Sequence, residues 1–210
     1  DVQVESLSVS ETDAATLEED GFKVFKGLLE LKPFRKDLRA WHATVKKHGD
    51  AIFNAGDTRR TQARFQPPSA LVDAARRVAP HLEARDWTLL RSAPGCSPQP
   101  AHCDWDPHSL GSSNATDVPC GMLVATDDNT PFDVWPGSWT HIKTAAEVKT
   151  EHCRKVLLNA GDALVFRGDL VHAGAEWPAA KARSNVRVHA FLDAPGVTRP
   201  ENNTFHVRSA

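Results

Sequence analysis

Apolar residues in the first 86 positions recur mostly at helical spacing. Between residues 33 and 47 they stand three and four positions apart, and Pro33 occupies the first turn, so this segment is predicted to be an amphipathic helix. A similar apolar face predicts a second helix over residues 69–84, and a capped start predicts a short helix over residues 10–21. Residues 22–29 mix apolar and lysine positions, which is typical of an edge strand.

From residue 87 onwards the pattern changes to short apolar runs separated by turn residues. These runs predict strands over residues 87–92, 121–126, 132–134, 154–158, 163–166, 170–174 and 185–192, with a hairpin turn at residues 159–162. Such short strands indicate a mostly β fold with flanking N-terminal helices, as a double-sheet jelly roll or cupin-like barrel. We expect one domain over 1–210, with a helical and edge-strand flank over 1–86, a β-barrel core over 87–193 and a C-terminal tail over 194–210.

Composition narrows the classes of function. A formal charge of −2 over 210 residues, of which 25% are charged, indicates no general affinity for nucleic acid or for an acidic surface. The sequence shows no signal peptide and no apolar run of membrane length. Its four cysteines form no Cys-x-x-Cys pair, and a chain of this size needs no disulfide framework. We therefore expect free thiols and a cytoplasmic or other reducing intracellular compartment.

The strongest chemical signal is the pair His102-x-Asp104. Residues two apart on an extended segment project from the same face, so this imidazole and this carboxylate converge. His172 ends a later apolar run, is followed by two small residues, and is the candidate third ligand. Two histidines and one carboxylate form the facial triad that holds Fe(II) and leaves positions open. We predict that His102, Asp104 and His172 are metal ligands and catalytic residues.

Candidate anion-binding residues lie on and near the last predicted strand. Alternation places Arg187 and His189 on the same face of that strand, which is expected to neighbour His172. A buried Arg187 needs an anion, and one carboxylate of a dicarboxylate cosubstrate would supply it. An internal Asp or Glu is the alternative partner. Arg183 is a competing anion clamp, and His189 is a further candidate for cosubstrate binding.

The order of these motifs resembles the Fe(II)/2-oxoglutarate-dependent dioxygenase superfamily, nearest its phytanoyl-CoA dioxygenase-like branch. The resemblance rests on the His-x-Asp pair, the Trp-Pro-Gly-Ser turn at 135–138, residues 161–172 and the Arg-x-His at 187–189. It implies a double-stranded β-helix, iron held by the two histidines and the aspartate, and an arginine that binds 2-oxoglutarate, with O2 consumed in oxidising a C–H bond. Two positions depart from related enzymes: Trp139 stands where a histidine is usual, and histidine replaces serine in the Arg-x-Ser pattern.

The partner is less closely defined than the chemistry, and a small-molecule substrate is expected. Arg59, Arg60 and Arg64 form a local basic cluster in an expected polar loop over residues 57–66. Such clusters are typical of a solvated face, but arginines also suit a phosphate-bearing substrate such as a nucleic acid. Two other functions would use the same triad: a cupin-like barrel that binds Zn(II), and a binding module that kept the barrel and lost turnover.

Overall fold

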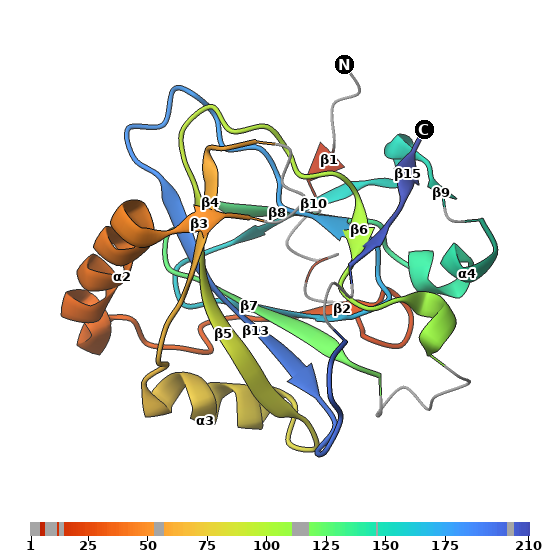
Figure 1. Cartoon of the computed structure of the whole chain (residues 1–210), viewed down its shortest axis with the longest axis horizontal. Helices are drawn as coiled ribbons and strands as arrows, with labels where there is room; N and C mark the ends of the chain where they lie inside the picture. The colour runs from red at the N-terminus through yellow and green to blue at the C-terminus, as the bar shows by residue number, and fades with distance from the viewer. Residues whose placement is uncertain are drawn as a thin grey trace.

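Two β-sheets pack face to face and enclose the interior of the protein (Figure 1). The computed structural model describes residues 5–6, 12, 15–52, 57–110, 118–145, 147–200 and 204–210. Most strand pairs are antiparallel, and strands that follow one another in sequence often lie in different sheets. This architecture confirms the mostly β, double-sheet fold that the short apolar runs predict.

The larger sheet has the strand order β2-β11-β7-β13-β5-β4-β3. Its predicted edge strand does lie at the edge, although it is shorter than predicted, and β13 lies between β7 and β5. The bounds of these strands are β2 Phe22–Phe25, β3 Asp50–Ala51, β4 Arg60–Arg64, β5 Glu83–Ser92, β7 Cys120–Ala125, β11 Ala163–Arg167 and β13 Asn185–Asp193.

The smaller sheet has the order β1-β10-β8-β12-β6-β14. Within it β12 pairs with β6 at a single position, where His172 lies opposite His102. A separate pair joins β9 to β15. The bounds of these strands are β1 Glu5–Ser6, β6 His102–Cys103, β8 Thr130–Val134, β9 Glu147–Val148, β10 Arg154–Leu158, β12 His172–Ala173, β14 Phe205–His206 and β15 Arg208–Ser209.

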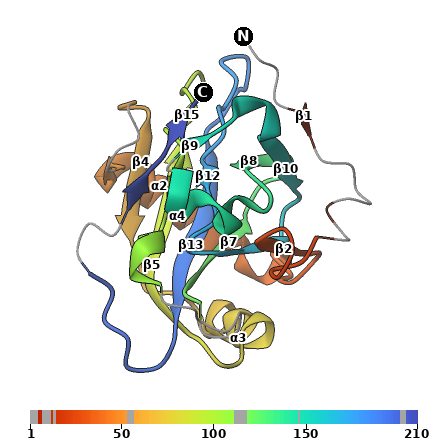
Figure 2. The same cartoon turned by 90° about the vertical axis from the view of Figure 1, so that its right-hand side faces the viewer.

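Two helices, α2 (Arg35–His48) and α3 (Ser69–Val78), cover the outer face of the larger sheet (Figure 1). Trp41 and Leu71 of these helices share an apolar cluster with Val188 of β13, as their helical spacing predicts. Figure 1 shows α4 (Ile142–Ala145) and the β9–β15 pair on the side opposite α2, and Figure 2 shows that side facing the viewer. The short helical elements are η1 Lys32–Phe34, η2 Pro107–Ser109, η4 Ser138–Thr140, α4 Ile142–Ala145 and η5 Thr150–His152.

Two predicted helices differ from the structure. The helix predicted over residues 69–84 ends at Val78, because Pro80 disfavours helical conformation in the residue before it. Strand β5 already begins at Glu83. Of the helix predicted over residues 10–21, residues 10, 11, 13 and 14 lie outside the described residues, and residues 17–20 form a turn.

The turn predicted as a hairpin at residues 159–162 instead carries the chain between the two sheets. Strand β10 before it pairs with β8 in the smaller sheet, whereas β11 after it pairs with β7 in the larger sheet. Gly161 has φ of 93° and lies against the carbonyl oxygen of Leu29, so a side chain there would meet both backbone strain and a collision. The prediction of a turn at Gly161 is therefore confirmed, whereas the prediction that this turn closes a hairpin is wrong.

Alternate residues of strand β13 face opposite sides of the larger sheet. Val186 and Val188 face the helices, while Arg187 and His189 face the space between the sheets, as the alternation predicts. The prediction that this strand neighbours His172 is wrong. His172 belongs to β12 of the smaller sheet, so β13 faces it across the interior.

The cysteines are free, as their spacing predicts. Cys96, Cys103, Cys120 and Cys153 are all buried, and burial raises the pKa of Cys120 and of Cys153 to about 12, which keeps these two thiols protonated. Among the residues described, no helix is both long and apolar enough to cross a membrane.

Asp133 of β8 is a buried carboxylate that weakens the fold at neutral pH. Its Oδ1 atom has no hydrogen-bond partner in the described part of the chain, and burial raises its pKa to about 6 despite the nearby charge of Lys155. The native carboxyl therefore binds a proton more tightly than the unfolded one, so stability falls as pH rises from about 4 through 6.

We expect Asp133→Asn to raise the free energy of unfolding by about 1–3 kcal/mol at pH 7.5 and to change it little at pH 4. Urea denaturation of both proteins at the two pH values measures this difference. An equal effect at both pH values would contradict the assignment of the pH dependence to this carboxyl.

Candidate metal and cosubstrate site

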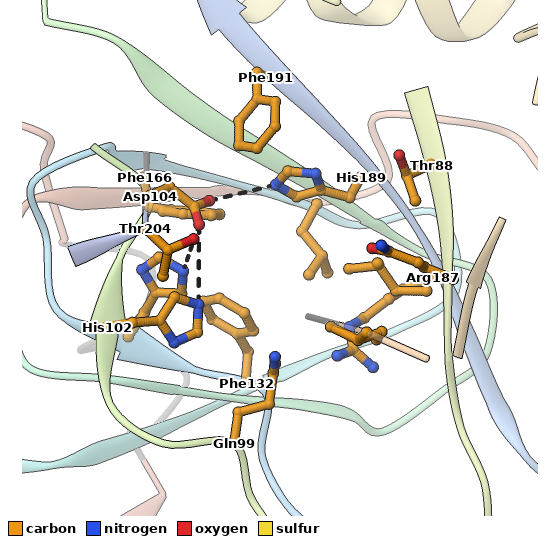
Figure 3. A pocket seen from close by; sticks show the side chains of 15 residues that line it. Thr88, Gln99, His102, Asp104, Phe132, Phe166, Arg187, His189, Phe191 and Thr204 are labelled. Carbon is orange, nitrogen blue, oxygen red and sulfur yellow. Dashed lines mark ion pairs between the residues drawn. The ribbon is translucent and has the colours of Figure 1, made fainter. Parts of the chain in front are cut away.

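The three predicted ligands meet between the sheets. His102 and His172 are opposed on β6 and β12, and Asp104 follows β6 by one residue. The Oδ1 atom of Asp104 lies 3.9 Å from Nε2 of His102 and 3.6 Å from Nε2 of His172 (Figure 3). One ligand atom from each residue lies within 4.8 Å of the other two, which is close enough for a single metal ion to contact all three.

Backbone carbonyls orient both histidines. Nδ1 of His102 lies 2.8 Å from the carbonyl oxygen of Pro100, and Nδ1 of His172 lies 3.0 Å from that of Leu170. Since a carbonyl only accepts, each Nδ1 carries a proton, and Nε2 is the ring nitrogen that faces Asp104. Burial, aided by the nearby His172, lowers the pKa of His102 to about 4, so this imidazole is neutral at physiological pH.

Asp104 is the ionised member of the group. Burial alone would raise its pKa, but the charges and hydrogen bonds of His172 and His189 hold that pKa well below its usual range. Nε2 of His189 lies 3.6 Å from the Oδ2 atom of the carboxylate, on the side away from the other two histidines. An ionised carboxylate beside two imidazoles is a donor set that a divalent metal binds.

Two phenylalanine rings hold His172 in place. Phe132 stacks on its imidazole at a centroid distance of 5.3 Å, and Phe166 contacts it at 4.6 Å. Gly121 of β7 gives Phe166 its space, because a Cβ atom there would collide with the ring. His172 is 3% exposed, so its position is fixed by packing as well as by the bond at Nδ1.

The triad opens into a cavity of about 170 Å³ that also contains Arg187 (Figure 3). Arg187 donates from Nη1 to Oγ of Ser92 at 2.9 Å, while its buried Nε has no partner among the described residues. No carboxylate in the described chain pairs with it, contrary to the alternative of an internal Asp or Glu. Burial, together with the nearby charge of Arg60, lowers the pKa of Arg187 to about 9.

Arg60 lies directly behind this arginine. It was expected in a solvated loop, yet it begins strand β4 and is 0% exposed. Its guanidinium donates to the carbonyl oxygens of Ser97, Gly174 and Ala175 and, from Nη1, to the same Ser92 hydroxyl at 2.9 Å. Backbone oxygens therefore satisfy Arg60, and Arg187 is the cation left facing the cavity.

Gln99 is a cavity residue that the sequence analysis missed. Its Oε1 atom accepts a hydrogen bond from the backbone N–H of Gly174 at 3.0 Å. With the oxygen engaged there, its amide nitrogen points into the cavity (Figure 3). The available signal was its position three residues before His102.

The other basic candidates do not reach this cavity. Arg183 is a largely exposed side chain that pairs with Asp127 at 3.1 Å, and it is absent from the cavity lining. Arg59 pairs with Asp57 and Arg64 with Asp86, both outside the cavity, while Arg60 is buried. The three arginines therefore form no common basic surface, and the described part of the chain gives no support to nucleic-acid binding.

A wider chamber of about 760 Å³ adjoins the cavity. The two spaces share lining residues, and the rest of the chamber wall is mainly polar or charged. The shared residues are Gln62, Thr88, Asp104, Phe191 and Thr204, and the chamber adds Thr44, His48, Asp50, Ala63, Arg64, Asp86, Arg199 and Pro200.

No protein-family model matches the sequence, and a search of curated proteins also finds no match. Solved structures do match. HygX from Streptomyces hygroscopicus, with nickel and 2-oxoglutarate bound, superposes with a TM-score of 0.63 at 14% identity over 92% of this chain and 89% of its own. AviO1 from Streptomyces viridochromogenes Tue57 gives 0.62 at 15% identity, covering 93% and 99%.

The epimerase SnoN from nogalamycin biosynthesis, in complex with Fe3+, α-ketoglutarate and nogalamycin RO, gives a TM-score of 0.58 at 17% identity, with 95% of each chain covered. SnoN and SnoK are non-haem α-ketoglutarate-dependent enzymes. The chain therefore has the double-stranded β-helix fold of non-haem iron and 2-oxoglutarate-dependent enzymes, and the His-x-Asp and His residues of a facial triad are present in it.

Proposed function

We propose that this protein is a non-haem Fe(II)- and 2-oxoglutarate-dependent oxygenase that oxidises a C–H bond of a small molecule. One observation carries the proposal: a triad of two histidines and one carboxylate faces the same cavity as a buried guanidinium, which has no carboxylate partner among the described residues. The triad suits a metal, and the guanidinium suits an anion. A dicarboxylate cosubstrate would bind the metal at one end and the guanidinium at the other.

The residues present fit Fe(II). His102 and His172 would each bind the metal through Nε2, and Asp104 offers an ionised oxygen. Imidazole and carboxylate in this ratio are the facial ligand set of non-haem iron oxygenases, and three protein ligands leave positions for cosubstrate and O2. Iron and 2-oxoglutarate, once bound, supply the oxidising power by consuming O2, with succinate and carbon dioxide as products.

The residues present also fit 2-oxoglutarate. Arg187 is a desolvated cation whose Nε has no partner in the described chain, and a carboxylate would offset the cost of burying it. Gln99 adds an amide donor between Arg187 and the triad. Arg187 would hold the distal carboxylate, with Ser92 fixing the guanidinium, while Phe132 and Phe166 keep water from the metal side of the cavity.

The adjoining chamber is the proposed place for the substrate. It reaches Asp104 from outside, and its described lining is mainly hydroxyl, amide and charged side chains. Such a lining suits a polar small molecule better than a lipid chain, which needs an apolar wall. HygX has been solved with hygromycin B and SnoN with nogalamycin RO, and these small-molecule complexes support the same class here.

Anaerobic titration of the Fe(II)-loaded protein with 2-oxoglutarate tests the proposal. We expect a visible metal-to-ligand charge-transfer band that saturates at one equivalent of cosubstrate per iron. The same titration of protein loaded with Zn(II) is the control, and it gives no such band. Stoichiometric iron binding without the band would refute the 2-oxoglutarate assignment and leave the metal-binding barrel as the better description.

A further inference from the structure

We infer that His189 is a positioning residue for the metal ligand Asp104: its imidazole engages the carboxylate oxygen that faces away from the two histidine ligands. The inference rests on the proposed function for the identity of the metal. It gives a role to the histidine at 189, which replaces the serine of the Arg-x-Ser pattern.

The two oxygens of Asp104 face different partners. Oδ1 lies 3.6 Å from Nε2 of His172 and 3.9 Å from Nε2 of His102, whereas Oδ2 lies 3.6 Å from Nε2 of His189. Figure 3 shows His189 reaching the carboxylate from the opposite side of the cavity. The group of ligand atoms within 4.8 Å of one another contains His102, Asp104 and His172 but not His189. His189 therefore lies beyond the carboxylate, and not within the triad.

The backbone of the larger sheet sets the direction of the His189 side chain. The pairing of β13 with β5 shifts register between His189 and Phe191, and such an irregularity redirects side chains near a site. The Phe191 ring then packs edge-on against the imidazole, with centroids 4.8 Å apart and planes at 87°. His189 is 9% exposed, so its direction is set by its surroundings and not by solvent.

The main chain of Asp104 is held independently. Arg199 donates from Nη1 to the carbonyl oxygen of Asp104 at 2.7 Å and pairs with Asp193 at the end of β13. The backbone position and the side-chain rotation of Asp104 thus have separate supports. Arg199 fixes the backbone, whereas the imidazole of His189 acts on the rotation of the carboxylate through Oδ2. A donor there reserves that oxygen and leaves Oδ1 for the metal.

The test compares His189→Leu, which removes the donor, with His189→Gln, whose amide nitrogen reaches about as far as Nε2. His152→Leu is the matched control, since it makes the identical change at an exposed histidine that pairs with Glu151 and lines neither the cavity nor the chamber. Fe(II) affinity is measured anaerobically by competition with a chromophoric chelator. Circular dichroism and thermal unfolding of the metal-free proteins show whether each variant folds.

We expect His189→Leu to weaken Fe(II) binding about 10–100-fold, the usual effect of losing an outer-shell partner, while His189→Gln stays within about threefold of wild type. His152→Leu should bind Fe(II) as the wild type does. A folded His189→Leu protein with wild-type affinity would overturn the inference, and so would a His189→Gln protein as weak as the leucine variant. Because the readout is iron affinity, a wild-type protein that binds iron but not 2-oxoglutarate would refute the proposed function without altering this result.

Discussion

Replacing His172 with alanine is expected to abolish stable Fe(II) binding, with a loss of affinity of more than about 100-fold, the upper end of what the loss of an outer-shell partner costs. The variant removes one of three ligand atoms that lie within 4.8 Å of one another. His102 and Asp104 alone are a weak chelate, since they present one nitrogen and one oxygen. Anaerobic loading followed by iron determination measures the effect, and 2-oxoglutarate should then give no charge-transfer band.

Packing complicates the alanine variant, and a second variant separates the two effects. His172 is 3% exposed and packs against both Phe132 and Phe166, so alanine also leaves a cavity. His172→Phe keeps an aromatic ring in that space and removes the ligand nitrogen. His152→Ala, at an exposed histidine that pairs with Glu151, is the control and should bind iron normally. Stoichiometric iron in a folded His172→Phe protein would contradict the ligand assignment.

Sequence periodicity predicted the strands well, because the order of apolar and polar residues within a segment reflects which faces of the strand are buried. Strand β10 has the predicted bounds, β11 and β13 each extend one residue beyond the predicted end, and β7 both begins and ends one residue earlier than predicted. The errors arose where the pattern of one segment depends on another segment. Residues 159–162 look like a hairpin turn, but pairing with distant strands sends the chain into the other sheet.

In the site, too, the features set by the local sequence were predicted, and those set by distant segments were not. His102 and Asp104 were predicted to converge because a strand projects alternate residues to one side, and Arg187 was placed in the interior by the same alternation. Arg60 was misjudged because its polar neighbours indicate a solvated loop. Pairing of β4 with β5 buries it instead, where three backbone carbonyls from distant loops accept its hydrogen bonds. The residues around position 60 therefore give no indication that these acceptors lie nearby.

Arg187→Met is expected to weaken 2-oxoglutarate binding about 100-fold or more and to leave Fe(II) binding unchanged. Removing one partner of a buried pair of charges weakens binding by about 2–5 kcal/mol in measured cases. This loss corresponds to roughly 30-fold to several thousand-fold in affinity. The triad lies across the cavity from Arg187 and does not depend on it. Titration of the charge-transfer band measures cosubstrate affinity, and chelator competition measures that of the metal.

The same substitution should stabilise the protein in the absence of cosubstrate, by about 1–3 kcal/mol in the free energy of unfolding. Arg187 is 2% exposed, has no carboxylate partner in the described chain and lies beside Arg60, and burial lowers its pKa to about 9. Its charged form is therefore costly in the native state at neutral pH, and methionine removes that cost at the loss of one hydrogen bond to Ser92. Urea denaturation without ligand measures the gain.

Arg183→Met is the matched control, because it makes the identical change at the competing candidate, whose side chain is exposed and pairs with Asp127. It should alter neither cosubstrate affinity nor, beyond about 0.5 kcal/mol, stability. A loss of 2-oxoglutarate binding in Arg183→Met but not in Arg187→Met would reverse the assignment of the clamp. A lower stability of Arg187→Met without ligand would mean that the buried cation already has a compensating partner, and the argument that it awaits a carboxylate would then fail.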